Sequence, residues 1–340
     1  MTSGDGNTAV GKYTGSAITT GENNVFLGRN ANINGTTGDE NVIIGKDAVG
    51  LGVLTGNENV VIGMGAGYDM TSATASVFVG DNSGANVTTG ARNIALGKNA
   101  IKQPDTESDN LGIGYNALEG AIAGGEYNVA IGNYSLDALT SADNNVALGY
   151  QAGGALTTGG TNVLIGALAA SAGTMTGADN VIIGYQSGKN MSSGHDSVFV
   201  GENAGRNMNT GSNNVVVGKD AGVDMTDDTD NVVIGYRAGN ALTDSSNVII
   251  GSDAARVGTT HTENVIIGYS AAGSGNLTGD SNVIIGKAAG QLMTSGPHNV
   301  LIGKQAGAKI TEGDKNVIVG SQAGAELTGC LLYTSDAADE

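Results

Sequence analysis

The chain has 340 residues, of which 58 are glycine, 2 are proline and none is tryptophan, and only 14% are charged. This composition suits tightly wound β structure better than a globular α/β enzyme. The formal net charge of −18 argues against nucleic acid as a partner, because phosphate binding needs a basic face, and it is compatible with an extracellular surface. No apolar run approaches the ~18 residues of a membrane span, and residues 1–20 lack the basic and apolar regions of a signal peptide.

A five-residue phrase, Asn-Val-Ile-Ile-Gly or a close variant, recurs nineteen times, from the phrase that ends at Gly11 to the phrase that ends at Gly320. Successive closing glycines are 17 residues apart in thirteen intervals, 18 apart in four and 16 apart in one. A period this short, with no helical 3.6 pattern, excludes helical repeats and propeller blades and leaves no room for a separate catalytic domain. It predicts an all-β fold, a single parallel β-solenoid (β-roll) of about nineteen 17-residue coils. At ~4.8 Å per coil the solenoid would be a rod on the order of 90 Å long.

The apolar positions of the phrase predict which side chains form the core. The second and fourth residues are Val, Ile or Leu in every phrase except at Thr8, and residues two apart on a strand share a face. We therefore expect pairs such as Val181 and Ile183 to form the inner wall of each coil. A small residue three positions after the glycine, as at Ala48, and a Leu, Met, Ile or Val seven positions after it, as at Met70, complete the predicted core.

The middle residue of the phrase lies between those two and is expected to face outward, yet it is apolar in every phrase except at Gly112. Such a stripe exceeds the few hundred Å² that soluble monomers usually expose, which predicts an interface between chains. The alternative is a strand that is buried on both faces by a wider core. The residues assigned to this predicted oligomer interface are Phe26, Ile43, Val61, Phe78, Leu164, Ile182, Phe199, Val216, Val233, Ile249, Ile266, Ile284, Leu301 and Ile318.

Two polar columns accompany the strands. Asn opens seventeen of the nineteen phrases, with Ser76 and Ser197 as the exceptions, and stacked Asn side chains predict a ladder of amide hydrogen bonds between coils. Thr recurs eight residues after many of the glycines, as at Thr71 and Thr157. A second Thr column two residues away, which a flat ice-binding face would need, is not maintained. Ice binding therefore stays only a minor alternative.

The repeat pattern stops at residue 329, and the only cysteine, Cys330, begins an eleven-residue tail that fits no repeat position. The tail resembles the conceptual translation of a sequencing adapter from metagenomic libraries. We therefore predict a β-solenoid domain over residues 1–329 and a non-native tail over residues 330–340. Because neither end has a polar cap, which solenoids normally carry, we also expect further repeats in the intact gene or end-to-end stacking of copies.

The phrase resembles the head repeats of trimeric autotransporter adhesins, as in Asn128-Val-Ala-Ile-Gly132 and Asn145-Val-Ala-Leu-Gly149. It is also similar to long repeats of phage tail fibres and marine bacterial surface proteins, on the strength of Asn144-Asn-Val-Ala-Leu-Gly-Tyr-Gln-Ala152. The resemblance covers residues 5–329 and implies a left-handed parallel β-roll that assembles as a trimer. The period here is longer than in the adhesin heads, so each coil is expected to have a longer return loop.

Candidate catalytic or metal-binding residues are scattered. His195, His261 and His298 fall in turns of separate coils, which does not predict a shared metal or catalytic site. Acidic turns such as Asp227-Asp228 and Asp105-Thr-Glu107 could bind Ca²⁺, but the calcium-roll repeat motif is absent and a solvated face is the expected alternative. Glycine-rich matches to phosphate-binding loops lack the strand-then-helix context that gives them meaning.

Tyrosines directly after the closing glycine are the candidate ligand contacts, since their rings can stack and their hydroxyls can hydrogen-bond; the alternative is that they only cover the corner of the coil. They are Tyr115, Tyr150, Tyr185, Tyr236 and Tyr269.

We therefore predict an extracellular structural and adhesive rod with no catalytic activity and no cofactor, a segment of a trimeric surface adhesin or of a viral tail fibre. Its expected partners are further copies of itself, as a trimer or a filament, and a cell-surface or glycan target. One alternative is a subunit of an extracellular filament that assembles end to end. A solenoid that binds ice, calcium or glycan is another. A polysaccharide-cleaving β-helix fits less well, because no cluster of Asp, Glu or Arg lies on long loops.

Overall fold

Each phrase forms one three-residue β-strand in the computed structural model, which describes residues 4–103, 105–258 and 262–328. The chain divides into two units, residues 1–180 and residues 181–340. The strands of the first unit are β1 (Thr8–Val10), β2 (Val25–Leu27), β3 (Val42–Ile44), β4 (Val60–Ile62), β5 (Val77–Val79), β6 (Ile94–Leu96), β7 (Leu111–Ile113), β8 (Val129–Ile131), β9 (Val146–Leu148) and β10 (Val163–Ile165).

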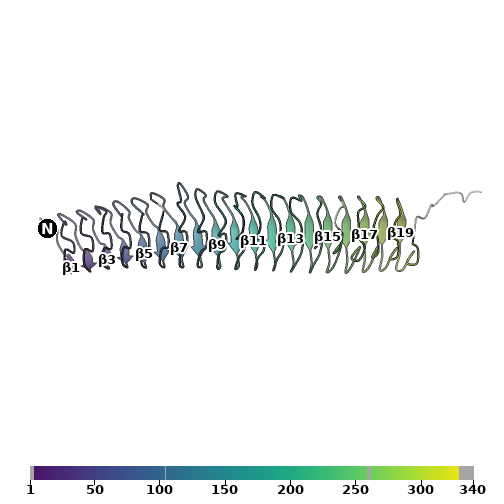
Figure 1. Cartoon of the computed structure of the whole chain (residues 1–340), viewed down its shortest axis with the longest axis horizontal. Coiled ribbons are helices and arrows are strands. Elements are labelled where there is room, and N and C mark those ends of the chain that lie inside the picture. The colour runs from purple at the N-terminus through teal and green to yellow at the C-terminus, as the bar shows by residue number, and fades with distance from the viewer. Residues whose placement is uncertain (1–3, 104, 259–261, 329–340) are drawn as a thin grey trace, which may run out of the picture. The chain divides into compact units, whose positions relative to one another are not determined.

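The strands of the second unit are β11 (Val181–Ile183), β12 (Val198–Val200), β13 (Val215–Val217), β14 (Val232–Ile234), β15 (Val248–Ile250), β16 (Val265–Ile267), β17 (Val283–Ile285), β18 (Val300–Ile302) and β19 (Val317–Val319). Within each unit every strand pairs in parallel with the strand of the next coil, as Figure 1 shows. Val60, for example, lies opposite Val77. The fold class is therefore the predicted one, an all-β parallel β-solenoid with one strand per coil of about 17 residues. The predicted boundary at residue 329 lies at the edge of the described residues and stays a prediction, and the tail lies outside them.

The closing glycines are required by both backbone geometry and stacking. Gly28 has φ +131°, which L side chains rarely adopt, and a Cβ added there would lie 2.6 Å from the carbonyl oxygen of Gly45 in the next coil. Only glycine can therefore occupy the position that follows each strand. This requirement explains why glycine recurs there with such a regular period.

The middle residue of the strand points into the core, which is the reverse of the prediction. In most strands this residue is buried and its two neighbours are partly exposed, as in β11, where Ile182 is 0% exposed. Val181 and Ile183 do share a face, as predicted, but that face is the outer one. The fourteen residues assigned to an intermolecular stripe are instead core residues of their own chain, each at most 5% exposed: Phe26, Ile43, Val61, Phe78, Leu164, Ile182, Phe199, Val216, Val233, Ile249, Ile266, Ile284, Leu301 and Ile318.

The other predicted core positions are confirmed. Ala48, three residues after its glycine, and Met70, seven residues after its glycine, are both 0% exposed. Together with the middle strand residue they fill a thin interior, so each coil has room for only one large side chain on the strand.

Side-chain size is matched across this interior in some of the coils. A large middle residue can face a glycine four positions after the closing glycine: a Cβ added at Gly84 would lie 2.6 Å from Cδ2 of Phe78. A small middle residue can face a large one, as with Ala130 and the fully buried Leu136 in one coil.

Elsewhere the space is shared between coils. Ala147 has Gly153 at its partner position, and a Cβ added at Gly153 would lie 2.7 Å from both Leu136 and Leu164 of the neighbouring coils. The interior is therefore filled by matching within a coil and between adjacent coils.

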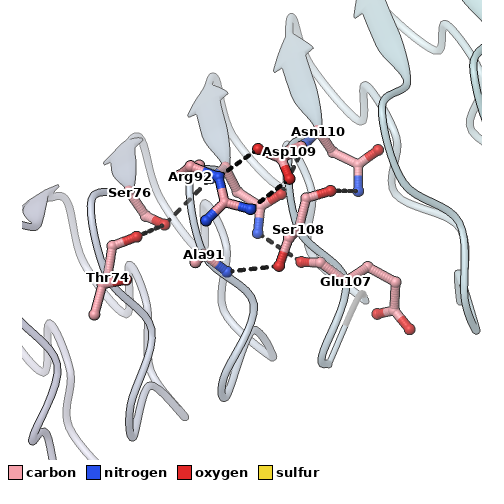
Figure 2. A network of polar contacts seen from close by, with 9 residues as sticks. Thr74, Ser76, Ala91, Arg92, Glu107, Ser108, Asp109 and Asn110 are labelled. Atoms are coloured by element: carbon pink, nitrogen blue, oxygen red, sulfur yellow. Dashed lines mark hydrogen bonds and ion pairs between the residues drawn. The ribbon is translucent and has the colours of Figure 1, made fainter.

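The predicted asparagine ladder is confirmed. Oδ1 of Asn24 accepts the backbone N–H of Asn41 at 2.8 Å and its Nδ2 at 3.2 Å, while Nδ2 of Asn24 donates to the carbonyl of Gly38 at 2.8 Å. These side chains are buried, and their bonds satisfy backbone groups that the short strands leave unpaired. Ser76 takes the place of one Asn, and its Oγ accepts the N–H of Asn93 at 3.2 Å (Figure 2).

The threonine column is part of the same scaffold. Thr71 donates its hydroxyl to the carbonyl of Thr88 at 3.0 Å, and Thr294 donates to the carbonyl of Thr311 at 2.8 Å. These hydroxyls are thus engaged in bonds between coils, which explains why Thr recurs at this position.

Among the described residues there is no helix with the length and apolar character that a membrane crossing requires.

Candidate functional site on the outer strand face

The outer face of each unit is built from the first and third residues of its strands, which we call the outer face throughout. These residues are Val, Ile or Leu in every strand except at Thr8. Val25 and Leu27 are 40% and 45% exposed, and most of the others are partly exposed because neighbouring strands lie only about 4.8 Å apart and cover one another's flanks. The result is two parallel columns of β-branched or leucine side chains facing solvent.

The extent of this face separates it from ordinary scattered surface hydrophobics. Nine or ten strands, each about 10 Å long and 4.8 Å from the next, give roughly 450 Å² of continuous apolar face per unit. That value lies in the range of about 300–600 Å² typical of the largest patch on a monomer, a patch that is often functional. Each of the two units carries such a face.

Charged side chains next to the strands pair with one another along the stacking direction. Arg92, two residues before β6, donates Nε and Nη2 to the carboxylate of Asp109 in the next coil, each at 2.6 Å (Figure 2). After the strands, Nζ of Lys219 lies 2.9 Å from Oε2 of Glu202. The outer face is therefore an apolar strip bordered by charged residues, some of which pair with one another, which is the composition of a protein interface with a polar rim.

The five predicted tyrosines are exposed, but the structure does not bring them all together. Tyr115 and Tyr150 lie on either side of Tyr134, which the sequence analysis did not single out. Tyr185, Tyr236 and Tyr269 lie in separate coils of the second unit and are 49%, 44% and 54% exposed. Tyr134 lies two residues after its closing glycine, whereas the five predicted tyrosines follow theirs directly. Its place in the repeat therefore did not mark it as a candidate.

The acidic turns are structural rather than solvated. Glu107 is 5% exposed and accepts backbone N–H groups of Asp105 and Thr106 at 3.0 Å and of Gly124 at 2.8 Å. Burial opposes the charge of Glu107, but these bonds outweigh it and lower its pKa. Asp228 is 3% exposed. The expected solvated face is therefore wrong at both positions, and the described residues hold no group of three or more His, Cys, Asp or Glu that could bind a metal ion.

Two aspartates carry strongly shifted pKa values. Burial raises the pKa of Asp228 to about 6, with Asp227 and Asp244 adding repulsion, although the backbone N–H of Thr226 donates to its Oδ2 at 3.0 Å. Burial likewise raises the pKa of Asp137 to about 6. Both shifts arise because a carboxylate is packed into a turn, where burial makes its charged form less favourable.

The Asp228 shift predicts how stability depends on pH. The folded state holds this proton up to about pH 6 and the unfolded chain releases it near pH 3.8, so the folded state binds more protons between those values. The stability that this group contributes is complete below pH 3.8 and is lost as the pH rises through 6. Asp228→Asn should therefore stabilise the protein at pH 7.5 by about 1–2 kcal/mol and have little effect near pH 4.

Thermal unfolding of the variant and of the wild type at both pH values measures this difference. Asp224→Asn, at an exposed position of the same coil, is the control and should show no such pH-dependent gain. An equal gain in the two variants, or a gain for Asp228→Asn at low pH, would contradict the assignment.

The two histidines that the structure describes do not form a site. Nδ1 of His195 lies 2.7 Å from Oδ2 of its neighbour Asp196, and His298 donates its backbone N–H to the carbonyl of Asp280. His261 lies outside the described residues.

Comparison with known proteins gives this chain no family. No protein-family model matches it, and no curated protein matches it.

Proposed function

We propose that this chain is a non-catalytic structural and adhesive β-solenoid that works outside the cell, as a segment of a trimeric surface adhesin or of a viral tail fibre, and that it assembles with other copies of itself through the outer face. The observation that carries the proposal is the unbroken pair of apolar columns on every unit. Burying apolar surface contributes about 25 cal/mol per Å², so an exposed face of this extent favours association.

The area is sufficient for a stable contact. If the outer face of one unit is covered by the same unit of another copy, roughly 900 Å² is removed from water in total over the two copies, and roughly 1,800 Å² when the faces of both units are covered. A standard protein interface buries about 1,600 Å². Rim charges that already pair, such as Arg92 with Asp109, can lie at the edge of such a contact without burying an unpartnered ion.

The contact is tested by the mass of the protein in solution. Replacing Val198, Val200, Val215 and Val217 with threonine keeps the β-branched shape and adds a hydroxyl to four adjacent outer positions. We expect the wild type to be oligomeric at micromolar concentration and this variant to shift toward the monomer in analytical ultracentrifugation, because the hydroxyls resist desolvation.

Val216→Ala is the matched control, because Val216 lies on the same strand and points inward. It should lower the unfolding temperature and leave the oligomer mass unchanged. A wild type that is monomeric at all concentrations would overturn self-association, as would a threonine variant that keeps its mass.

The alternative is a filament subunit that stacks end to end through the open edges of its terminal coils. Electron microscopy separates the two arrangements. Long unbranched fibres that persist in the threonine variant favour end-to-end stacking, whereas short assemblies lost in that variant favour association through the outer face.

A further inference from the structure

Three tyrosine rings from three successive coils touch one another in the first unit. The ring centroids of Tyr115 and Tyr134 are 5.3 Å apart with planes at 74°, and those of Tyr134 and Tyr150 are 6.2 Å apart at 88°. Tyr115 and Tyr150 are 40% and 50% exposed, so the cluster presents ring surface to solvent. We call these three residues the tyrosine cluster.

Tyr134 is what joins the rings. At its position, two residues after the closing glycine, several other coils carry an amide or carboxylate that bonds to the next coil, as Asn99 does to Asn116 at 3.1 Å. The backbone N–H of Tyr134 donates to the carbonyl of Tyr115 at 2.9 Å, which fixes the two coils in register. The ring of Tyr134 thus bridges two tyrosines that would otherwise stand apart.

The cluster differs from three other exposed tyrosines in what covers its rings. Tyr13 lies under Lys12, Tyr236 under Arg237 and Tyr269 under Lys287, with the cation 4.8, 4.5 and 5.6 Å from the ring centroid. The ring contacts within the cluster, in contrast, are with other tyrosines. Its exposed ring surface is therefore available to a neutral, flat partner rather than to a cation already supplied by the chain.

Amide side chains are sequence neighbours of the cluster. Asn133 and Gln151 stand beside the three tyrosines in the sequence, and Oδ1 of Asn133 accepts the backbone N–H of Tyr115 at 2.9 Å. Nδ2 of Asn133 is the group that can donate a hydrogen bond to a ligand hydroxyl. Asp137 lies three residues after Tyr134, and Lys98, in the coil before Tyr115, has its Nζ 3.2 Å from Oδ2 of Asp81; the whole chain carries −18. This disfavours an anionic ligand.

We infer that the tyrosine cluster binds a neutral polysaccharide chain, with sugar rings stacked on Tyr115 and Tyr150 and hydroxyls bonded to the flanking amides. Aromatic faces accept the C–H faces of pyranose rings, and amides exchange hydrogen bonds with their hydroxyls. Three rings from three coils span about 10 Å, which suits a chain of sugars better than a single residue. The inference rests on the adhesive role proposed above and names the chemistry of its target.

The test is electrophoresis of the full-length protein in native gels that contain hydroxyethyl cellulose, laminarin, galactomannan or dextran, with alginate as an anionic probe. We expect at least one neutral polysaccharide to retard the wild type. The double variant Tyr115→Ala and Tyr150→Ala should bind it at least about tenfold more weakly. Tyr185→Ala and Tyr236→Ala are matched controls outside the cluster and should bind as the wild type does.

Three results would overturn the inference: no retardation by any of the four neutral polymers, retardation by alginate alone, or a double variant that binds as tightly as the wild type. Tyr134→Asn introduces the amide that other coils carry at this position and should also weaken binding. Circular dichroism checks that the variant keeps its fold. The oligomer mass is measured on the same samples, so failure of sugar binding with an intact oligomer leaves the outer-face proposal standing.

Discussion

Phe78→Ala should destabilise the first unit by about 3–5 kcal/mol, because it removes one of the largest fully buried side chains and leaves a cavity in an interior only one side chain thick. The neighbouring space cannot collapse easily, since residue 84 on the other side is glycine and offers no atoms to fill it. Urea denaturation followed by circular dichroism measures the loss.

The balance of side-chain size makes this prediction specific. Gly84→Leu alone should also be destabilising, by about 1–3 kcal/mol or more, because its Cβ would overlap the Phe78 ring. The double variant Phe78→Ala with Gly84→Leu reproduces the arrangement that Ala130 and Leu136 have in another coil. It should recover at least half of the summed loss, and additive losses in the double variant would show that the two positions do not share one space.

Asn128→Leu should cost about 3 kcal/mol or more, since it breaks several buried hydrogen bonds at once and, although it keeps the branch at Cγ, places a larger side chain in the ladder. Oδ1 of Asn128 accepts the N–H of Asn145 at 3.1 Å, and its Nδ2 donates to the carbonyl of Ala142 at 2.8 Å. Both backbone groups would be left buried without their partner. Hydrogen exchange of the Asn145 amide reports the broken bond directly, and urea denaturation gives the free energy.

Asn128→Ser is the control that the chain itself supplies. Ser76 and Ser197 occupy the same column, and their hydroxyls accept the next backbone N–H at 3.2 and 3.1 Å. Serine should therefore preserve protection of the Asn145 amide and cost only about 1 kcal/mol, for the lost bond to Ala142. If serine and leucine are equally damaging, the ladder stabilises through packing of the asparagine side chain and not through its oxygen.

The period, strand positions and glycine column were predictable because each follows from a local rule. A two-residue alternation of Val and Ile indicates a strand, and a glycine at fixed spacing marks a backbone turn that other residues cannot adopt. The buried Ala48 and Met70 were also predictable, since small and flexible apolar residues recur at fixed distances from that glycine. These rules need no knowledge of which way the strand faces.

The direction in which each strand faces was not predictable from alternation, because both faces are apolar. Ile182 and its neighbours Val181 and Ile183 have similar hydrophobicity, so nothing in their chemistry distinguishes inside from outside. The informative signal was volume in some of the coils: phenylalanine at position 78 or 199 is matched by glycine six residues later, and alanine at 130 by leucine at 136. Such compensation indicates side chains that share a space, but the pair Ala147 and Gly153 does not show it, so the signal is not uniform along the chain.

The tyrosine cluster and the buried acids depend on contacts between coils, which a single-coil pattern does not contain. Tyr134 is off the column of Tyr115 and Tyr150, and only the stacking of coils brings the three together. Similarly, Glu107 and Asp228 look like any acidic turn in the sequence, and their burial depends on how the corner folds back onto the backbone.

The matching of Phe78 with Gly84 inside one 17-residue segment also bears on how such a gene can change length. Excision of residues 60–76 joins Asn59 directly to Val77 and recreates an intact phrase, Asn-Val-Phe-Val-Gly. It removes Val61 together with Gly67, where an added Cβ would lie 3.3 Å from Val61, so the size match inside each remaining coil is kept. Recombination in whole-coil steps can therefore lengthen or shorten the protein while the phrase and the size match within each coil are preserved, and only the contacts between the newly adjacent coils are changed.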